Sequence, residues 1–156
     1  MENAVRIAVV DDMPRDREIL RSLLLDYAGS HGFSWEISLF SSGAALLAAM
    51  EQDRYAVVFL DILMDGLDGM ETARRLRAID SDVLLVFVTT EAEYAVEGYE
   101  VEAAGFLVKG DVPQKKRFDR LMARLERRLR PDELLDLSAG NAAIKVPAGK
   151  VIYAEV

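Results

Sequence analysis

Residues 56–61, Ala-Val-Val-Phe-Leu-Asp, decide the fold class of this chain, because five apolar residues in a row lead directly to a carboxylate. An uninterrupted apolar run of this length is typical of a strand that is buried on both faces, as in the middle of a parallel sheet. Residues 83–88, Val-Leu-Leu-Val-Phe-Val, form a similar run that leads to Thr89. Residues 5–10 form a third, which ends at Asp11 and Asp12. The pattern predicts a parallel sheet with polar side chains at one edge.

Helical stretches alternate with these strands over the first 130 residues. Asp12 is expected to cap the first helix, with Pro14 in its first turn, and Ser42 is expected to open the second. Because short right-handed crossovers join successive strands, five such units predict an α/β fold, a doubly wound five-stranded parallel sheet flanked by five helices. The expected strands are 5–10, 35–40, 56–60, 83–88 and 105–108, and the expected helices are 14–28, 42–50, one that ends at Leu76, 92–100 and one marked by the apolar stripe from Phe118 to Leu129.

Composition excludes several classes of protein. The chain has 156 residues, 51% of them apolar, with no cysteine and one histidine, His31. A disulfide framework, a Cys-ligated zinc site and a thiol nucleophile are therefore ruled out, and a His-rich metal site or a Ser-His-Asp triad is disfavoured. No apolar run is long enough to span a membrane, and the N-terminus lacks the layout of a signal peptide, so we expect a cytoplasmic protein.

The net charge of −8 is unevenly distributed along the chain. Residues 1–112 carry 21 acidic and 9 basic side chains, whereas residues 113–130 carry 2 acidic and 8 basic ones. The acidic body does not suit nonspecific binding to nucleic acid, because it repels phosphates. The basic stripe fits either an interaction face or the solvated surface of a helix.

Reactive side chains follow four of the five expected strands. Asp11 and Asp12 follow the first strand, Asp61 the third, Thr89 the fourth and Lys109 the fifth. Three carboxylates at one edge repel one another unless a cation neutralises them, and a site made of oxygen ligands suits Mg²⁺ better than zinc. A carboxylate is also a nucleophile for a phosphoryl group, whose charge a lysine and a hydroxyl could stabilise.

The segments that hold these residues resemble the receiver domain of two-component response regulators, which has a flavodoxin-like fold. The matching segments are 9–12, 59–64, 68–71, 87–90 and 106–109, in that order, within residues 4–130. The resemblance implies that Asp61 is the phosphoacceptor and that a histidine kinase supplies the phosphoryl group. It also implies that Mg²⁺ binds Asp11, Asp12, Asp61 and the main-chain carbonyl of Leu63. Thr89 is then the switch hydroxyl, Phe106 the switch aromatic residue and Lys109 the phosphate-pairing lysine.

A narrower resemblance concerns the rest of the chain. Residues 93–101, followed by 106–109, resemble receivers that carry a LytTR-type DNA-binding domain, and residues 144–147 and 151–155 resemble the opening strands of that domain. This implies a linker at 131–142 and a short β extension at 143–156 that begins a truncated output domain. No residue in this chain is then a DNA contact, and DNA binding belongs to the missing part.

Two positions depart from the receiver pattern. Gly110 follows Lys109 where receivers usually have a proline joined by a cis bond, so we expect the aim of Lys109 to depend on whether this peptide is cis or trans. Asp65 replaces a common proline after Asp61 and adds a fourth acid near the site.

The sequence thus predicts a phosphorylation-dependent switch in transcription regulation, and not an enzyme. The first alternative is a Mg²⁺-dependent phosphatase or phosphotransferase with an aspartyl-phosphate intermediate, but Leu63 stands where such an enzyme needs a second acid. A nucleotide-binding module ranks last, because no glycine-rich loop follows the first strand. The expected partner surface, a homodimer face, comprises 92–98, 105–108 and 114–130, with acidic Glu91, Glu93 and Glu97 opposite the basic stripe.

Overall fold

A computed structural model of the chain describes residues 4–64, 66–90, 97–111 and 115–129. They fall into two compact units, with the boundary after Asp119. The first unit holds the whole sheet, and the described part of the second is the helical segment 120–129. Residues 130–156, which include the expected linker and β extension, lie outside the described residues, so those two expectations stay predictions.

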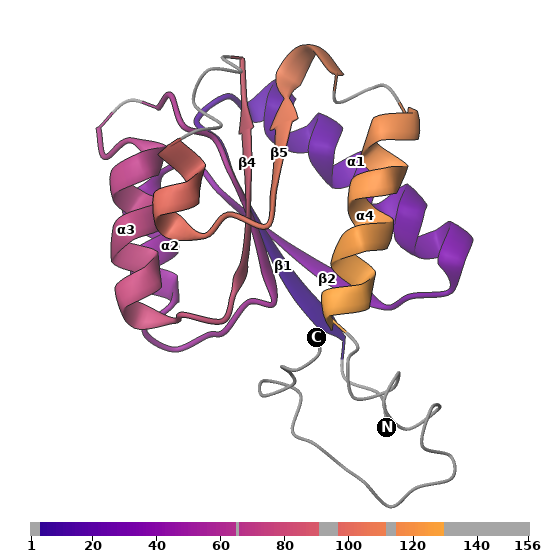
Figure 1. Ribbon diagram of the computed structural model, residues 1–156, viewed down its shortest axis with the longest axis horizontal. Coiled ribbons are helices and arrows are strands. Elements are labelled where there is room, and N and C mark those ends of the chain that lie inside the picture. The colour runs from indigo at the N-terminus through magenta and orange to yellow at the C-terminus, as the bar shows by residue number, and fades with distance from the viewer. Residues whose placement is uncertain (1–3, 65, 91–96, 112–114, 130–156) are drawn as a thin grey trace, which may run out of the picture. The chain divides into compact units, whose positions relative to one another are not determined.

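The sheet is parallel, with five strands in the order β2-β1-β3-β4-β5 (Figure 1). This is the doubly wound sheet that the sequence predicts. Three of the five strands have the predicted bounds, β3 begins one residue later, and β4 is shifted by one residue at both ends. The strands are β1 (Val5–Val10), β2 (Trp35–Phe40), β3 (Val57–Leu60), β4 (Leu84–Thr89) and β5 (Gly105–Val108).

Helices account for most of the remaining described residues. The α-helices are α1 (Pro14–His31), α2 (Gly43–Ala49), α3 (Gly69–Ile79) and α4 (Lys115–Leu129), and short 3-10 helices span Glu97–Val101 (η2) and Lys109–Asp111 (η3). Five α-helices were expected, and the described part of the chain has four. Of the predicted helix 92–100, residues 92–96 lie outside the described residues, and its C-terminal part belongs to η2. After η2, Glu102 has a left-handed φ of 53°, and the amide of Ala103 donates to the carbonyl of Gly98 at 3.0 Å.

Two helix starts test the capping predictions. Ser42 caps α2 as expected, since its hydroxyl accepts a hydrogen bond from the amide of Ala45 at 3.1 Å. The prediction that Asp12 caps α1 is wrong. Met13 is the N-cap residue and makes no side-chain cap, because the helix begins at Pro14 and Asp12 lies one residue too early.

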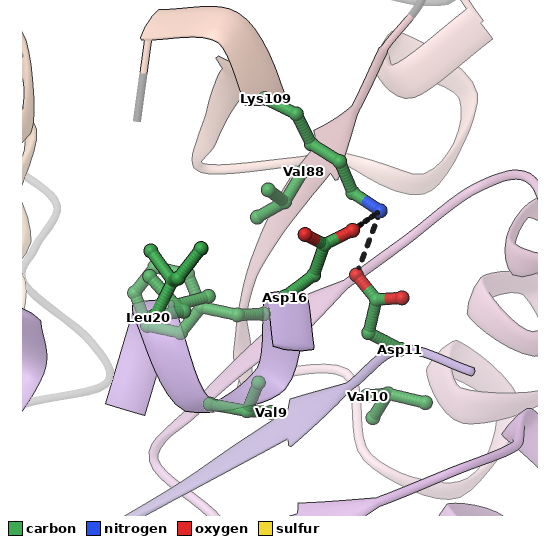
Figure 2. Close-up of a pocket in the computed structure, with 9 residues that line it drawn as sticks. Val9, Val10, Asp11, Asp16, Leu20, Val88 and Lys109 are labelled. Atoms are coloured by element: carbon green, nitrogen blue, oxygen red, sulfur yellow. Dashed lines mark hydrogen bonds and ion pairs between the residues drawn. The ribbon is translucent and has the colours of Figure 1, made fainter. Parts of the chain in front are cut away.

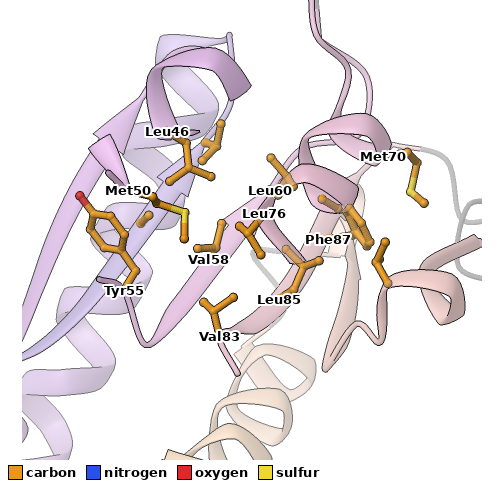
Figure 3. Close-up of a cluster of buried hydrophobic side chains, with 14 of the residues drawn as sticks. Leu46, Met50, Tyr55, Val58, Leu60, Met70, Leu76, Val83, Leu85 and Phe87 are labelled. Carbon is orange, nitrogen blue, oxygen red and sulfur yellow. The ribbon is translucent and has the colours of Figure 1, made fainter. Parts of the chain in front are cut away.

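The hydrophobic core beside α2 and α3 packs against one face of the sheet. Inward side chains of alternate strand residues pack there against Leu46 of α2 and Leu76 of α3 (Figure 3). The strand residues in this core are Ala8, Val10, Val58, Leu60, Leu85 and Phe87. Register pairs Val10 with Leu60 and Leu60 with Phe87, so that β1 and β3 end level, while β4 continues two residues further to Thr89.

Candidate functional site

Asp11 and Asp61 stand side by side at the carboxyl edge of the sheet. The backbone pairing of β1 and β3 continues past the strands, because the amide of Asp61 donates to the carbonyl of Val10 at 3.0 Å. One carboxylate oxygen from each of Asp11, Asp12 and Asp61 lies within 4.8 Å of the other two. The three acids expected from the sequence therefore converge, and two of them are almost completely buried.

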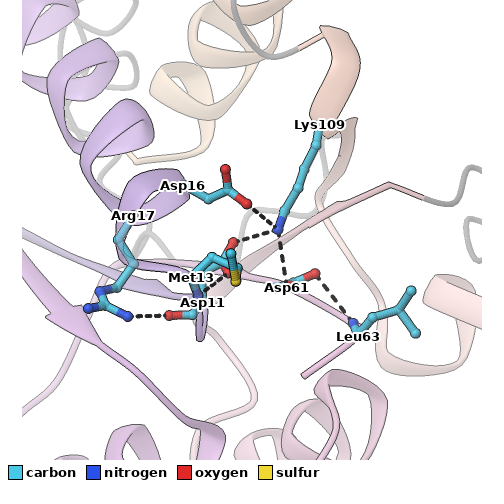
Figure 4. Close-up of polar contacts among 7 residues, drawn as sticks. All are labelled: Asp11, Met13, Asp16, Arg17, Asp61, Leu63 and Lys109. Carbon is cyan, nitrogen blue, oxygen red and sulfur yellow. Dashed lines mark hydrogen bonds and ion pairs between the residues drawn. The ribbon is translucent and has the colours of Figure 1, made fainter. Parts of the chain in front are cut away.

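Local backbone geometry orients the two buried carboxylates. The amide of Met13 donates to Asp11 Oδ1 at 2.9 Å, and the amide of Leu63 donates to Asp61 Oδ1 at 3.3 Å (Figure 4). In each case the carboxylate accepts from the residue two positions later, which is the geometry of an Asx turn. Arg17 of α1 holds the loop that follows β1, because its guanidinium donates to the carbonyl of Asp11 at 2.7 Å. The acids are thus held by the loops that follow their strands.

Glycine at position 69 allows the Asp61 loop to pack closely against α3. A Cβ atom at this position would overlap the carbonyl oxygen of Asp61 and lie 2.5 Å from the Cα of Ile62. The amide of Gly69 also donates to the carbonyl of Ile62 at 2.8 Å, and Asp68 caps α3 by accepting from the amide of Glu71. Gly66 has a φ of 79°, a left-handed conformation that glycine adopts easily, and it lies in the turn between Asp61 and the start of α3.

Lys109 reaches the acids from the end of β5. Its Nζ lies 2.9 Å from Asp11 Oδ2, 2.9 Å from Asp16 Oδ2 and 3.3 Å from Asp61 Oδ2. The described part of the chain contains no cis peptide bond, so the bond between Lys109 and Gly110 is trans. The substitution of glycine for the usual proline does not turn the lysine away from the acids.

The charges in this site perturb one another's protonation. Burial, followed by the neighbouring Asp11 carboxylate, raises the pKa of Asp61 from its ordinary 3.8 to about 6, although Lys109 opposes the shift. Burial by itself lowers the pKa of Lys109, but hydrogen bonds to Asp11 and Asp16 and the charge of Asp61 outweigh it and hold that pKa above its usual range. Lys109 is therefore a permanent cation beside a carboxylate that is costly to ionise.

The two expected switch residues lie on neighbouring strands. Thr89 ends β4 with its side chain buried, and its register partner in β5 is Val108, next to Lys109. Phe106 is half-buried, and its ring centroid is 6.4 Å from that of Phe87. Leu63, whose carbonyl is an expected metal ligand, has a side chain that is 46% exposed. Asp65, the expected fourth acid, lies outside the described residues.

Asp16 is the member of this site that sequence reasoning missed. It belongs to the first turn of α1, where an acidic residue has an ordinary explanation in the helix dipole. Its position four residues after Asp12 did not signal that its carboxylate would face Lys109, since that contact spans 93 residues of sequence.

A small cleft of about 50 Å³ lies beside Asp16 and Lys109 on the α1 side of the sheet (Figure 2). Asp11, Asp16 and Lys109 form its polar part. Its remaining walls are apolar and come from β1, α1, β3 and β4, namely Val9, Val10, Ile19, Leu20, Phe59 and Val88.

The donor set of the acid cluster fits a hard divalent cation. It offers carboxylate oxygens from three residues and no nitrogen or sulfur, a set that suits Mg²⁺. Two of these carboxylates are buried and close together, and burial followed by the charge of Asp11 raises the pKa of Asp61. A bound cation would relieve the repulsion between the two carboxylates, and Lys109 alone does so only in part.

Comparison with known proteins identifies the family. The chain matches the response regulator receiver domain over residues 7–122, and it therefore belongs to this family. The match covers the sheet except for the first two residues of β1, and it includes every site residue named above. It confirms the predicted receiver fold.

Relatives and solved structures agree with this assignment. The chain is 35% identical over 153 residues to the DNA-binding response regulator MtrA of Mycolicibacterium smegmatis, covering 94% of this chain and 61% of that protein. It is 33% identical over 105 residues to the positive alginate biosynthesis regulatory protein of Pseudomonas aeruginosa, covering 67% of this chain and 41% of that protein. The chain thus spans about three fifths or less of the length of these relatives.

Two solved structures show the same fold. The response regulator TrrA of Thermotoga maritima, determined in complex with Mg²⁺ and BeF, has a TM-score of 0.62 and 28% identity, covering 75% of this chain and 98% of that one. The chemotaxis response regulator CheY4 of Vibrio cholerae has a TM-score of 0.64 and 26% identity, covering 76% of this chain and 99% of that one. Among the described residues of our chain, no helix has the length and apolar character needed to cross a membrane.

Proposed function

We propose that this chain is a phosphorylation-dependent switch whose phosphoacceptor is Asp61. The observation that carries the proposal is the contact set of Asp61, a buried carboxylate with two acids on one side and the Lys109 ammonium 3.3 Å away. A carboxylate oxygen of Asp61 would form a bond to phosphorus while the bond between phosphorus and the donor's histidine nitrogen breaks. A histidine kinase is the donor that family membership favours.

Asp11, Asp12, Asp61 and the carbonyl of Leu63 are the groups that would hold Mg²⁺. When bound, this ion offsets negative charge on the carboxylates and on the phosphoryl oxygens. Lys109 would pair with a phosphoryl oxygen, and its high pKa keeps it charged at any physiological pH. The likeness to TrrA, which was solved with Mg²⁺ and BeF, supports this ligand.

Thr89 and Phe106 are the proposed switch pair. Thr89 ends the strand beside the strand that leads to Asp61, and Phe106, whose ring is half-buried, lies on the next strand. Movement of the Thr89 hydroxyl toward a phosphoryl oxygen would favour the inward ring. Phosphorylation would then bias two packings of β5 and its surroundings.

The output and the partner surface are also proposals. The name of MtrA and the motifs at 144–147 and 151–155 support control of transcription through a DNA-binding domain, which we propose to be of the LytTR type. The opposite charges of the segments around 91–97 and 115–128 support a homodimer in which each copy's acids face its partner's bases. Glu91 and Glu93 lie outside the described residues.

Turnover separates the switch from an aspartyl-phosphate enzyme. The chain would be incubated with acetyl phosphate and Mg²⁺, and separately with a generic phosphate ester. A switch accepts one phosphoryl group per chain and does not hydrolyse the ester beyond one equivalent. Sustained hydrolysis of the ester that Asp61→Asn abolishes would instead establish a phosphatase.

A further inference from the structure

Asp16 makes a contact that neither metal binding nor phosphorylation of Asp61 explains. Its Oδ2 lies 2.9 Å from Lys109 Nζ, which is as close as Asp11 and closer than Asp61. Asp16 is not among the acids that converge as a metal-binding group. Figure 4 shows it above the ammonium, on the α1 side, whereas Asp11 and Asp61 lie below.

The three contacts use the full donor capacity of the lysine. An ammonium group has three N–H donors and no acceptor. Lys109 faces three carboxylates within 3.3 Å, one each from Asp11, Asp16 and Asp61. A phosphoryl group on Asp61 would present further anionic oxygens to the same ammonium. Phosphorylation esterifies one oxygen of Asp61 and removes the charge of that carboxylate, so the phosphoryl oxygens then compete for the ammonium with Asp11 and Asp16.

Asp16 is the carboxylate that is least costly to release. Asp61 is no longer a free carboxylate once it is phosphorylated, and Asp11, whose side chain is 7% exposed, would be left as a desolvated charge. The side chain of Asp16 is 34% exposed and lies in the first turn of α1. Water and the helix N-terminus both stabilise its charge after Lys109 leaves.

We infer that Asp16 is a positioning residue that competes with the phosphoryl group for Lys109. In the unphosphorylated protein it holds the ammonium toward α1, and a phosphoryl oxygen has to draw the ammonium away from Asp16 to pair with it closely. Asp16 therefore weakens the binding of phosphoryl oxygens in the site. Because Asp16 lies on α1 and Lys109 follows β5, displacement also breaks a tie between those two elements. The inference rests on the proposed function of Asp61.

Binding of beryllofluoride, a mimic of the phosphoryl group, tests the competition. Its affinity would be measured by titration calorimetry at saturating Mg²⁺ for the wild type, Asp16→Asn, Asp16→Glu and Asp26→Asn. Asp26→Asn removes the same charge from an exposed position ten residues further along α1 and serves as the matched control. We expect Asp16→Asn to bind about three- to tenfold more tightly, which is the range for loss of a partly exposed ion pair to a charged competitor. Asp16→Glu and Asp26→Asn should stay near the wild type.

Mg²⁺ affinity without beryllofluoride gives a second readout, and Asp16→Asn is not expected to increase it. Removing the Asp16 charge should leave Mg²⁺ affinity equal or slightly weaker, whereas a merely loosened site would weaken both ligands. The inference about Asp16 would be overturned if Asp16→Asn bound beryllofluoride no more tightly than the wild type does. The proposed function of Asp61 would still stand in that case. Failure of the wild type to bind beryllofluoride would overturn the proposed function and this inference with it.

Discussion

Replacement of Asp61 by asparagine should stabilise the metal-free protein, by an amount that depends on pH. The pKa of Asp61 is raised from 3.8 to about 6 in the folded state. The folded state therefore binds this proton more tightly than the unfolded state does, and stability falls as pH rises from about 4 through 6. A difference of about two pKa units corresponds to about 3 kcal/mol at pH 7.5, and roughly half of it develops between pH 5 and pH 7.5. The asparagine side chain has no such proton to lose.

Urea unfolding in EDTA at pH 5, 6 and 7.5 measures this effect. The free energy of unfolding of Asp61→Asn minus that of the wild type should increase by about 1–2 kcal/mol between pH 5 and pH 7.5. Asp26→Asn, at an exposed position, is the control and should show no such trend. A difference that is independent of pH, or a variant that loses stability as pH rises, would refute the account of a buried, repelled carboxylate.

Three further predictions concern the metal, the loop and the partner surface. Millimolar Mg²⁺ should raise the melting temperature of the wild type by mass action but have little effect on Asp12→Ala, and an equal rise in both would remove Asp12 from the ligands. Gly69→Ala should lower the free energy of unfolding by about 1–3 kcal/mol in urea, since its Cβ overlaps the Asp61 carbonyl, and a neutral result would deny that close packing. Reversal of Arg120 and Arg124 to Glu should weaken self-association with beryllofluoride in sedimentation, and an unchanged association constant would place the partner surface elsewhere.

The sequence predicted the sheet and its polar edge because these depend on local pattern and chain direction. Five apolar runs in series leave few ways to pair, and the carboxyl ends of parallel strands share one edge. The positions of Asp11, Asp61 and Lys109 follow from that rule, and the structure brings the three together. A local pattern was therefore sufficient for residues that end strands.

Features that depend on side-chain reach or on exact helix starts were harder to predict. Asp16 looked like an ordinary acid in a helical first turn, and only the folded chain brings it to Lys109. Asp12 looked like a helix cap because it precedes Pro14, but a shift of one residue gives that place to Met13. Helical spacing after residue 92 did not reveal the turn at Glu102 that ends η2. In each case a tertiary contact or a single backbone angle decides the outcome.

The mass of the protein after treatment with acetyl phosphate tests the central claim most directly. Wild type and Asp61→Asn would each be incubated with and without Mg²⁺ and then weighed intact by mass spectrometry. The account predicts that the wild type gains the mass of one phosphoryl group, only when Mg²⁺ is present, and that Asp61→Asn gains none while remaining folded. A gain of phosphate by Asp61→Asn at an undiminished rate would contradict the assignment of Asp61 as the phosphoacceptor.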